Sequence, residues 1–401
     1  MPTFKYKVMN HQGQKSEGTF KANNKNEVLA MIEDNNYYPI EIKETLEREQ
    51  KDIFESFEKV KTKDLYIFCR QFHTMINAGA NISNALDVLR KQTVNKKLKK
   101  SLNEAYDDVQ KGISLSEALG KHNDVFPDLL INMINTGEVS GNLDIIMSRM
   151  ASHFEKENKI NNQLKSAMVY PMVLAGLSVV VVIFLLTFIM PTFIGMFEGS
   201  GVPLPLPTRI VMGLSEFIQT KWYILIAVIS VAVYGVKNYT KSPIGRLSLD
   251  GLKLKLPIIK DTTEKVIVSR FTRTLSTVLA SGVSLVQALE VVQRVVGNKV
   301  AENSLEVIKE KVLKGISLGE AIGDESLFPV MLHSMIKIGE ESGSLDDILD
   351  KTANFYDEEL EASLKRMTTM LEPLMIIVMG VIIGFIVIAM MMPMFDMVNT
   401  V

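Results

Sequence analysis

The chain has 401 residues, of which 47% are hydrophobic and 22% charged, with 44 Lys plus Arg against 46 Asp plus Glu. A net charge of −2 argues against a nucleic-acid-binding protein, and the single cysteine, Cys69, excludes an intrachain disulfide framework and a Cys-rich metal site. A mean hydropathy of +0.15 is high for so charged a chain and indicates soluble domains joined to a few very apolar segments. We therefore expect a mainly helical, membrane-attached protein of two to three domains.

The N-terminal part, residues 1–46, has the pattern of a small α+β module. It predicts strands at 4–8, 18–22 and 38–42 and a helix at 26–35, in a ββαβ-like order. The first 25 residues lack the apolar segment of a signal peptide, so we expect this end of the chain in the cytoplasm.

An internal repeat follows. VQKGISLSEALG at 109–120 recurs as VLKGISLGEAIG at 312–323, identical at nine of twelve positions, and GEVSGNLD at 137–144 recurs as GEESGSLD at 339–346. The spacing between matching positions changes only once, by a single position, which indicates a duplication of about 125 residues.

Each repeat reads as five to six amphipathic helices packed as an antiparallel bundle. Three sequences of the form Ser-x-x-Glu or Ser-x-x-Gln predict helix starts, because the serine oxygen can accept a hydrogen bond from the first turn. They begin at Ser114, Ser284 and Ser317.

Three segments are apolar enough to be candidate membrane helices. Residues 169–190 and 374–392 contain no charge, and each can cross about 30 Å of hydrocarbon at about 1.5 Å per residue. In both copies a pair of prolines with the same spacing marks the predicted helix ends: Pro171 with Pro191, and Pro373 with Pro393.

The third segment, 222–236, is shorter than the roughly 20 residues that a membrane helix needs, so its length leaves it undecided. Two near-identical charged repeats belong in one compartment, which requires an even number of crossings between them, and 222–236 must then span. The positive-inside rule agrees, because residues 237–260 carry six Lys or Arg and residues 191–221 carry two. We predict three spans, with both repeats cytoplasmic and the C-terminus outside.

The predicted fold class is a mainly α membrane protein with two duplicated cytoplasmic antiparallel helix bundles, three transmembrane helices and the small N-terminal module. The predicted divisions are the N-terminal module 1–46, a linker 47–63, the first helical domain 64–168, transmembrane helix 169–190, an extracytoplasmic loop 191–221, transmembrane helix 222–236, a basic cytoplasmic connector 237–265, the second helical domain 266–370, transmembrane helix 371–394 and an extracytoplasmic tail 395–401.

No catalytic, metal-binding or cofactor-binding residue is predicted. None of the five histidines is duplicated: His153, for example, aligns with Phe355, and we expect surface or half-buried histidines. The sequence has no Walker A loop and no HExxH, GxSxG or GxGxxG motif, so energy for any work would come from a partner.

The strongest duplicated signature is Gly-Glu-x-Ser-Gly, with candidate residues Gly137, Glu138, Gly141, Gly339, Glu340 and Gly343. In a structural interpretation it forms a tight corner between helices, where glycine permits close approach or a positive φ. In a functional interpretation the glutamates dock a basic partner surface, and Glu138→Gln would fold normally.

Gly380 and Gly384 form a GxxxG pattern in the third span, which would let another membrane helix approach closely. The first span carries Ser178 and Val182 at these positions, and the pattern is common by chance.

Together these motifs resemble those of the inner-membrane platform proteins of type IV pilus and type II secretion machines, the F-protein or PilC-type family. The matching elements are GISLSEAL with GISLGEAI, the repeated Phe-Pro and Gly-Glu-x-Ser-Gly-x-Leu, the proline-entered apolar helices, and the opening FKYKVMNHQGQKSEGTFKA with YYPIEI. The resemblance covers essentially the whole chain.

The resemblance implies a non-enzymatic platform, without cofactor, in the bacterial cytoplasmic (inner) membrane. Its implied partners are a cytoplasmic hexameric assembly ATPase (and a retraction ATPase where the pilus retracts), pilin or pseudopilin subunits, other inner-membrane pilus assembly proteins and further copies of the chain, but no nucleic acid. The family serves retractile pili, secretion pseudopili and DNA-uptake pili alike. A small transporter is the alternative, which three charge-free spans disfavour, and a membrane enzyme lacks any duplicated nucleophile or metal ligand.

Overall fold

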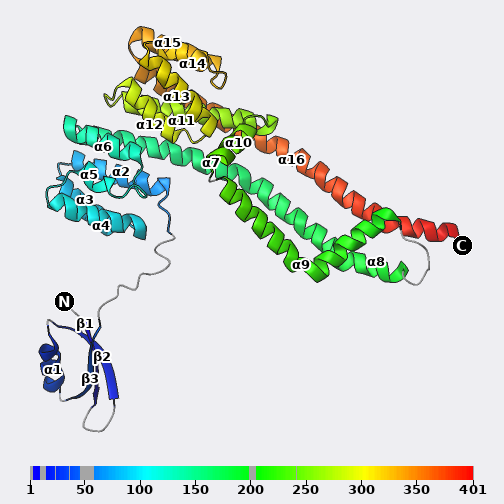
Figure 1. Ribbon diagram of the computed structural model, residues 1–401, viewed down its shortest axis with the longest axis horizontal. Helices are drawn as coiled ribbons and strands as arrows, with labels where there is room; N and C mark the ends of the chain where they lie inside the picture. Colours follow the sequence, from blue (N-terminus) through cyan, green and yellow to red (C-terminus); the bar gives the residue numbers. More distant parts are fainter. Residues whose placement is uncertain are drawn as a thin grey trace. The chain divides into compact units, whose positions relative to one another are not determined.

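The computed structural model of the chain describes residues 3–9, 15–22, 24–35, 37–45, 58–197, 205–240 and 242–400. The chain divides into two compact units, residues 1–60 with 93–100 and residues 61–92 with 101–401. The predicted fold class is confirmed: the protein is mainly helical, and the described residues include three helices long and apolar enough to cross a membrane and a small three-stranded sheet (Figure 1).

The N-terminal sheet consists of β1 (Thr3–Met9), β2 (Lys15–Lys21) and β3 (Tyr38–Thr45), antiparallel and in the order β2-β1-β3. Helix α1 (Lys25–Asp34) lies between β2 and β3 in the chain, so the ββαβ order is confirmed. Phe4 and Val8 of β1 share a core with Val28 and Ile32 of α1, because residues four apart lie on one face in either element.

Each repeat contains six helices, within the predicted number. The first has α2 (Thr62–Asn77), α3 (Ile82–Gln92), α4 (Lys96–Gln110), α5 (Leu115–Gly120), α6 (Asp128–Ser140) and the first part of α7 (Leu143–Phe184). The second has α11 (Pro257–Leu279), α12 (Leu285–Val295), α13 (Lys299–Leu313), α14 (Leu318–Gly323), α15 (Val330–Ser342) and the first part of α16 (Leu345–Thr400).

The predicted helix starts are confirmed at all three serines, because α5, α12 and α14 begin directly after Ser114, Ser284 and Ser317. The predicted hydrogen bond from the first turn to the serine oxygen is present at two of them. Ser114 and Ser317 each accept a hydrogen bond of 3.2 Å from the backbone N–H three residues on, at the start of α5 and α14. Ser284 instead donates its hydroxyl to the side chain of Gln287 at 3.0 Å. The same aromatic contact lies in both cores: Phe68 and Phe126 have ring centres 5.7 Å apart, and their duplicates Phe271 and Phe328 are 5.3 Å apart.

The prediction that membrane helices end at prolines is wrong. Helix α7 runs through Pro171, and α16 runs through Pro373 and Pro393. Past α7, a π-helical turn η2 (Leu185–Ile189) leads into α8 (Met190–Phe197), which contains Pro191. A proline ring crowds the carbonyl four residues earlier, and for Pro191 that residue lies in the wider π-turn.

The predicted loop 191–221 is also largely helical. Helix α9 (Leu206–Tyr239) begins well before the apolar segment, and its one non-helical residue, Lys221, lies directly before 222–236. The residues from 206 to 220 form a helix because Val211, Thr208 and Ser215 are buried against η2 and α16, a tertiary contact that hydropathy does not report.

The predicted connector and tail are helical as well. Helix α10 (Pro243–Lys253) starts at Ser242, whose hydroxyl accepts from the N–H of Gly245 at 3.1 Å, and α11 begins at Pro257. Helix α16 continues to Thr400. Much of the linker, residues 46–57, lies outside the described residues.

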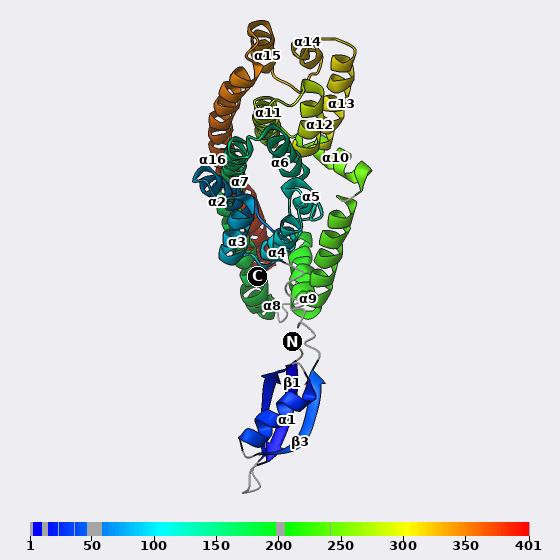
Figure 2. The same cartoon turned by 90° about the vertical axis from the view of Figure 1, so that its left-hand side faces the viewer.

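Within the larger unit, the repeats lie end to end. Figures 1 and 2 show α14 and α15 of the second repeat at one end, α3 of the first repeat at the other, and α6, α11 and α12 between them. Helices α7 and α16 pass from the bundles side by side into the apolar part of the unit (Figure 1).

The burial of Cys69 predicts an unreactive thiol. Its side chain has no exposed surface, and burial raises the pKa of the thiol, so the reactive thiolate is scarce. In membranes at neutral pH we expect less than a tenth of the full-length chain to react with a water-soluble maleimide in an hour, and complete reaction after denaturation in SDS, both read by mass spectrometry. Stoichiometric labelling of the folded protein would contradict this packing of α2.

Candidate functional site: the duplicated corner and the contact between the repeats

The Gly-Glu-x-Ser-Gly motif forms the end of α6 and of α15. Gly141 and Gly343 follow the last helical residue with φ of 71° and 69°, a left-handed conformation in which side chains are strained. Gly137 and Gly339 permit close approach, because a Cβ there would lie 3.1 and 3.0 Å from the Cα atom of the residue that begins α7 or α16. Both pairs of glycines are therefore needed for the chain to turn sharply into its long helix.

The glutamate of the motif contacts the other duplicated motif. The Glu138 carboxylate accepts hydrogen bonds from the backbone N–H groups of Leu115 and Ser116, at 2.6 and 3.0 Å, at the start of α5. Glu340 makes the equivalent two contacts at the start of α14, at 2.6 and 2.8 Å. The first N–H groups of a helix have no partner within it, and a carboxylate is a strong acceptor for them.

Each glutamate thus ties GISL-x-EA to the corner of its own repeat. These contacts provide a physical reason for the structural interpretation of the motif. Docking of a partner by Glu138 or Glu340 stays a prediction, and such a partner would compete with the two backbone hydrogen bonds.

A second duplicated contact, not predicted from the sequence, is an ion pair between the first and last helix of each repeat. Arg70 lies 2.7 Å from Glu155, and their duplicates Arg273 and Asp357 also lie 2.7 Å apart. Arg70 is 41% exposed, whereas Arg273 is 10% exposed and also bonds Asp350 at 2.8 Å. The sequence signal that could have predicted this pair was an acidic residue at the equivalent position of both copies, Glu155 and Asp357.

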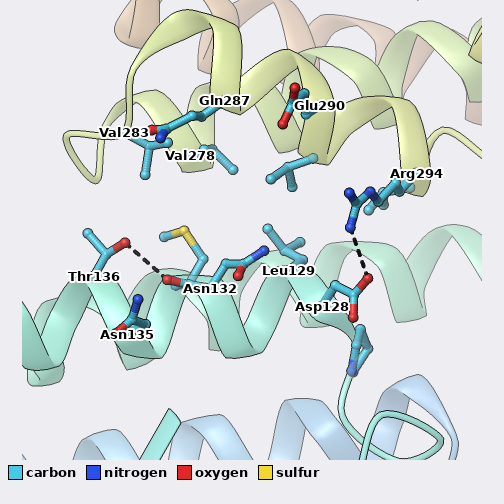
Figure 3. Close-up of a pocket in the computed structure, with 14 residues that line it drawn as sticks. Asp128, Leu129, Asn132, Asn135, Thr136, Val278, Val283, Gln287, Glu290 and Arg294 are labelled. Atoms are coloured by element: carbon cyan, nitrogen blue, oxygen red, sulfur yellow. Dashed lines mark hydrogen bonds and ion pairs between the residues drawn. The ribbon is translucent and has the colours of Figure 1, made fainter. Parts of the chain in front are cut away.

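The two repeats meet where α6 of the first faces α12 of the second. Figure 3 shows the groove between these helices, a cavity of about 400 Å³. Asp128 and Arg294 form an ion pair of 3.3 Å at one end of it. The apolar side chains that line it are Leu129, Met133, Val278, Val283, Val291 and Val295.

Helices α7 and α16 extend the contact between the repeats. Gln163 donates a hydrogen bond to Glu361 at 2.9 Å, and further along Tyr170 donates one to Glu372 at 3.1 Å. Tyr170 and Glu372 are equivalent residues of the two copies, so the two long helices lie level with each other where the charge-free segments begin.

Gly380 and Gly384, predicted to pack a membrane helix, have open space around them. A Cβ at either position would meet no atom within 4 Å in the described part of the chain. Within the same described ranges, no group of His, Cys, Asp and Glu could hold a metal ion.

Comparison with known proteins identifies the family. The family model described as "Type II secretion system (T2SS), protein F" matches residues 68–191 and, a second time, residues 271–393, and the model of that protein's N-terminal domain matches residues 1–43. The chain belongs to the type II secretion system protein F family. Because one model matches the chain twice, the predicted duplication is confirmed.

Relatives from both kinds of machine align along the chain. It is 37% identical to the type IV pilus assembly protein PilC of Thermus thermophilus, over 100% of this chain and 99% of that protein. It is 36% identical to PilC of Pseudomonas aeruginosa, over 86% and 92%, and 29% identical to the type II secretion system protein F of Vibrio cholerae, over 100% and 99%. The resemblance to the PilC-type and F-protein family is therefore confirmed.

In this member of the protein F family, one histidine departs from expectation. His153 is buried, not at the surface or half-buried, and neither ring nitrogen has a hydrogen-bond partner. It lies in the charged part of α7, well before the apolar segment that starts at residue 169, and beside Arg270 and Arg273 of the second repeat. Burial, followed by the positive charges of Arg273 and Arg270, lowers the pKa of His153 from 6.5 to about 4.

The contacts of Glu138 change the expected effect of Glu138→Gln. Glutamine has one acceptor oxygen, and its NH₂ group would face a backbone donor, so we now expect a loss of about 1–3 kcal/mol of stability instead of normal folding. Thermal unfolding of the full-length protein in detergent measures it. The matched control is Glu117→Gln, an exposed residue in the first turn of α5, which we expect to cost less than about 0.5 kcal/mol. Equal melting temperatures for the two variants would contradict this role of Glu138.

The buried His153 predicts a pH dependence of stability. Because the pKa is lower in the folded state, the unfolded chain gains a proton first, and stability falls as the pH drops from about 6.5 to about 4. The loss at pH 4 is on the order of 3 kcal/mol. Glu157 acts in the opposite sense, because burial raises the pKa of its carboxyl group.

His153→Phe isolates this contribution, because Glu157 is present in both proteins. Phenylalanine is the residue at the duplicate position, 355. We expect the variant's melting temperature in detergent to fall less steeply with pH between 6.5 and 4. Parallel profiles for the two proteins would show that His153 does not titrate with unfolding.

Proposed function

We propose that this protein is a non-enzymatic platform of a type IV pilus or a type II secretion pseudopilus. In this proposal a cytoplasmic hexameric ATPase drives it, and it passes motion to pilin or pseudopilin subunits leaving the inner membrane. Family membership supports a membrane component of such a machine. Without a nucleotide-binding motif in the sequence, the proposed work depends on the partner's energy.

The observation that carries the proposal is the continuity of α7 and α16. Each starts in the corner of a repeat and runs without a break into an apolar segment, over 42 and 56 residues. An α-helix is stiff along its axis, so a displacement of the bundle moves the membrane segment with it. A hinge or a loop between the two would absorb that displacement.

The proposed topology places the N-terminal module and both repeats in the cytoplasm and the C-terminus outside. It is supported by the six Lys or Arg in 237–260 against two in 191–221. The kink at Lys221 also supports a second crossing that begins at residue 222. The cytoplasmic surfaces would then face the ATPase, and the spans would face pilins, other assembly proteins and further copies of the chain.

The test interrupts α7 between the hydrogen bond of Gln163 to α16 and the membrane segment. Four glycines inserted after Ser166 lie between Gln163 and Tyr170 and remove the stiffness, since each glycine costs about 1 kcal/mol of helix stability. We expect normal amounts in the membrane but at least a tenfold loss of pili, or of secreted substrate, in the source bacterium.

The control inserts four alanines at the same place. Four residues make about 1.1 turns, so the helix continues with nearly the same face toward α16, and we expect most activity to remain. Wild-type assembly by the glycine variant would remove the mechanical role of α7. Loss of activity in both variants, with normal membrane insertion, would show that spacing and not stiffness matters.

A further inference from the structure

The contact between the two repeats joins unlike surfaces. The first repeat contributes one face of α6, and the second contributes one face of α12 with the end of α11. In a duplicated protein each of these faces exists twice, because α15 is the copy of α6 and α3 is the copy of α12. One α6-type face and one α12-type face are therefore left outside the contact, at opposite ends of the pair of bundles (Figure 1).

The free face on α15 is exposed and mainly apolar, with the polar Ser334 and Lys337 at the places of Asn132 and Asn135. Val330, Met331, Met335 and Ile338 occupy the positions that Asp128, Leu129, Met133 and Thr136 occupy in the groove. Val330 is 81% exposed, Met331 37% and Ile338 49%. Exposed aliphatic side chains spaced three, four and eight residues apart form a stripe along one face of a helix.

The free face on α3 has the composition to receive this stripe. Met75, Ala80, Asn84, Val88 and Lys91 correspond to Val278, Val283, Gln287, Val291 and Arg294 of the groove. Val88 is 38% exposed, and it aligns with the valine that faces α6 in the contact between the repeats. Asp87 and Gln92 stand at the places of Glu290 and Val295, and Lys91 pairs with Asp87 within α3. The acceptor face thus keeps an apolar centre and a basic residue at its end.

We propose that the α15 stripe of one chain packs against the α3 face of a second copy, repeating the contact of α6 with α12. The pair Asp128 and Arg294 becomes Val330 and Lys91, so the ion pair is replaced by packing of the lysine's methylene stem on valine. The contact is head-to-tail, and a head-to-tail contact forms a closed ring when its rotation permits closure. This proposal rests on the proposed function in one respect only, namely that the platform contains several copies of the chain.

Paired cysteines test the contact in the full-length protein. Two chains with different tags are expressed together in bacterial membranes that lack the other machine proteins, one with Val330→Cys and the other with Lys91→Cys. A short bismaleimide should join the two tags in a cross-linked dimer. Cys69 is buried and adds no background.

The chain offers matched controls. Asp128→Cys with Arg294→Cys in one chain should cross-link without forming a dimer, because that contact lies within the chain. Val139→Cys with Lys91→Cys should join no tags, since Val139 is 84% exposed but lies outside the stripe. Ile338→Glu should lower the dimer yield at least fivefold, and Val139→Glu should leave it unchanged.

Two results would overturn the proposal. One is a yield for the 330 and 91 pair no higher than for the 139 and 91 pair, while the control within the chain reacts. The other is a dimer from Val330→Cys alone, which would mean that α15 packs against α15 or that an unrelated contact dominates. Because these membranes hold no ATPase, failure here leaves motor coupling untouched, and failure of the glycine insertion leaves this contact untouched.

Discussion

The rest of each repeat depends on the hydrogen bonds between a corner glutamate and the N-terminus of a six-residue helix. Glu138 holds α5, and Glu340 holds α14, by two backbone N–H groups each. A helix this short has too few internal hydrogen bonds to be stable alone. With the carboxylate in place, the α5–α6 hairpin becomes rigid, and the glycine that ends α6 can set the direction of the long helix that follows. The direction of a long helix, and of the apolar segment that it carries, thus depends on a contact within the bundle.

The two repeats have the same internal ion pair because of the duplication, but the pair is exposed to solvent to a different extent in each. The pair of Arg70 and Glu155 is exposed, whereas its copy, Arg273 and Asp357, is covered. A solvent-exposed ion pair contributes little, and a covered one is costly to break on one side. His153 lies in the same covered region without hydrogen-bond partners. The second copy therefore has a buried polar cluster next to the first repeat, whereas the first copy has its equivalent ion pair at the surface.

What the sequence predicted well was local or duplicated. Serine at the start of α5 and α14 and glycine at the end of α6 and α15 act within a few residues, and the repeat itself is visible as an offset. Contacts across the fold were harder to predict. Residues 206–220 read as a loop because Arg209, Glu216 and Lys221 lower the hydropathy, although Val211 and Ser215 on the same helix are buried. The prolines were predicted to end the membrane helices because helix propensity considers a helix in isolation. The burial of His153 was not predicted because it depends on side chains of the other repeat. In the candidate site, the sequence predicted that the glycines permit a corner. It did not predict that Glu138 bonds the N-terminus of α5, because that helix lies elsewhere in the chain.

The two repeats contact each other in two different ways, once through their long helices and once through their bundles. This difference bears on how the larger unit could transmit motion. At the start of the charge-free segments, equivalent residues face each other, as Tyr170 and Glu372 show. In the bundles, unlike faces meet, α6 against α12. A rotation of one bundle against the other at the α6–α12 groove would therefore change the angle between α7 and α16, because each long helix is fixed to its own bundle by a corner and an ion pair. Since the groove holds a cavity and one ion pair of 3.3 Å between exposed side chains, it is the softer of the two contacts. On the proposed function, force applied to either bundle would be expressed as a change in the crossing of the two membrane helices.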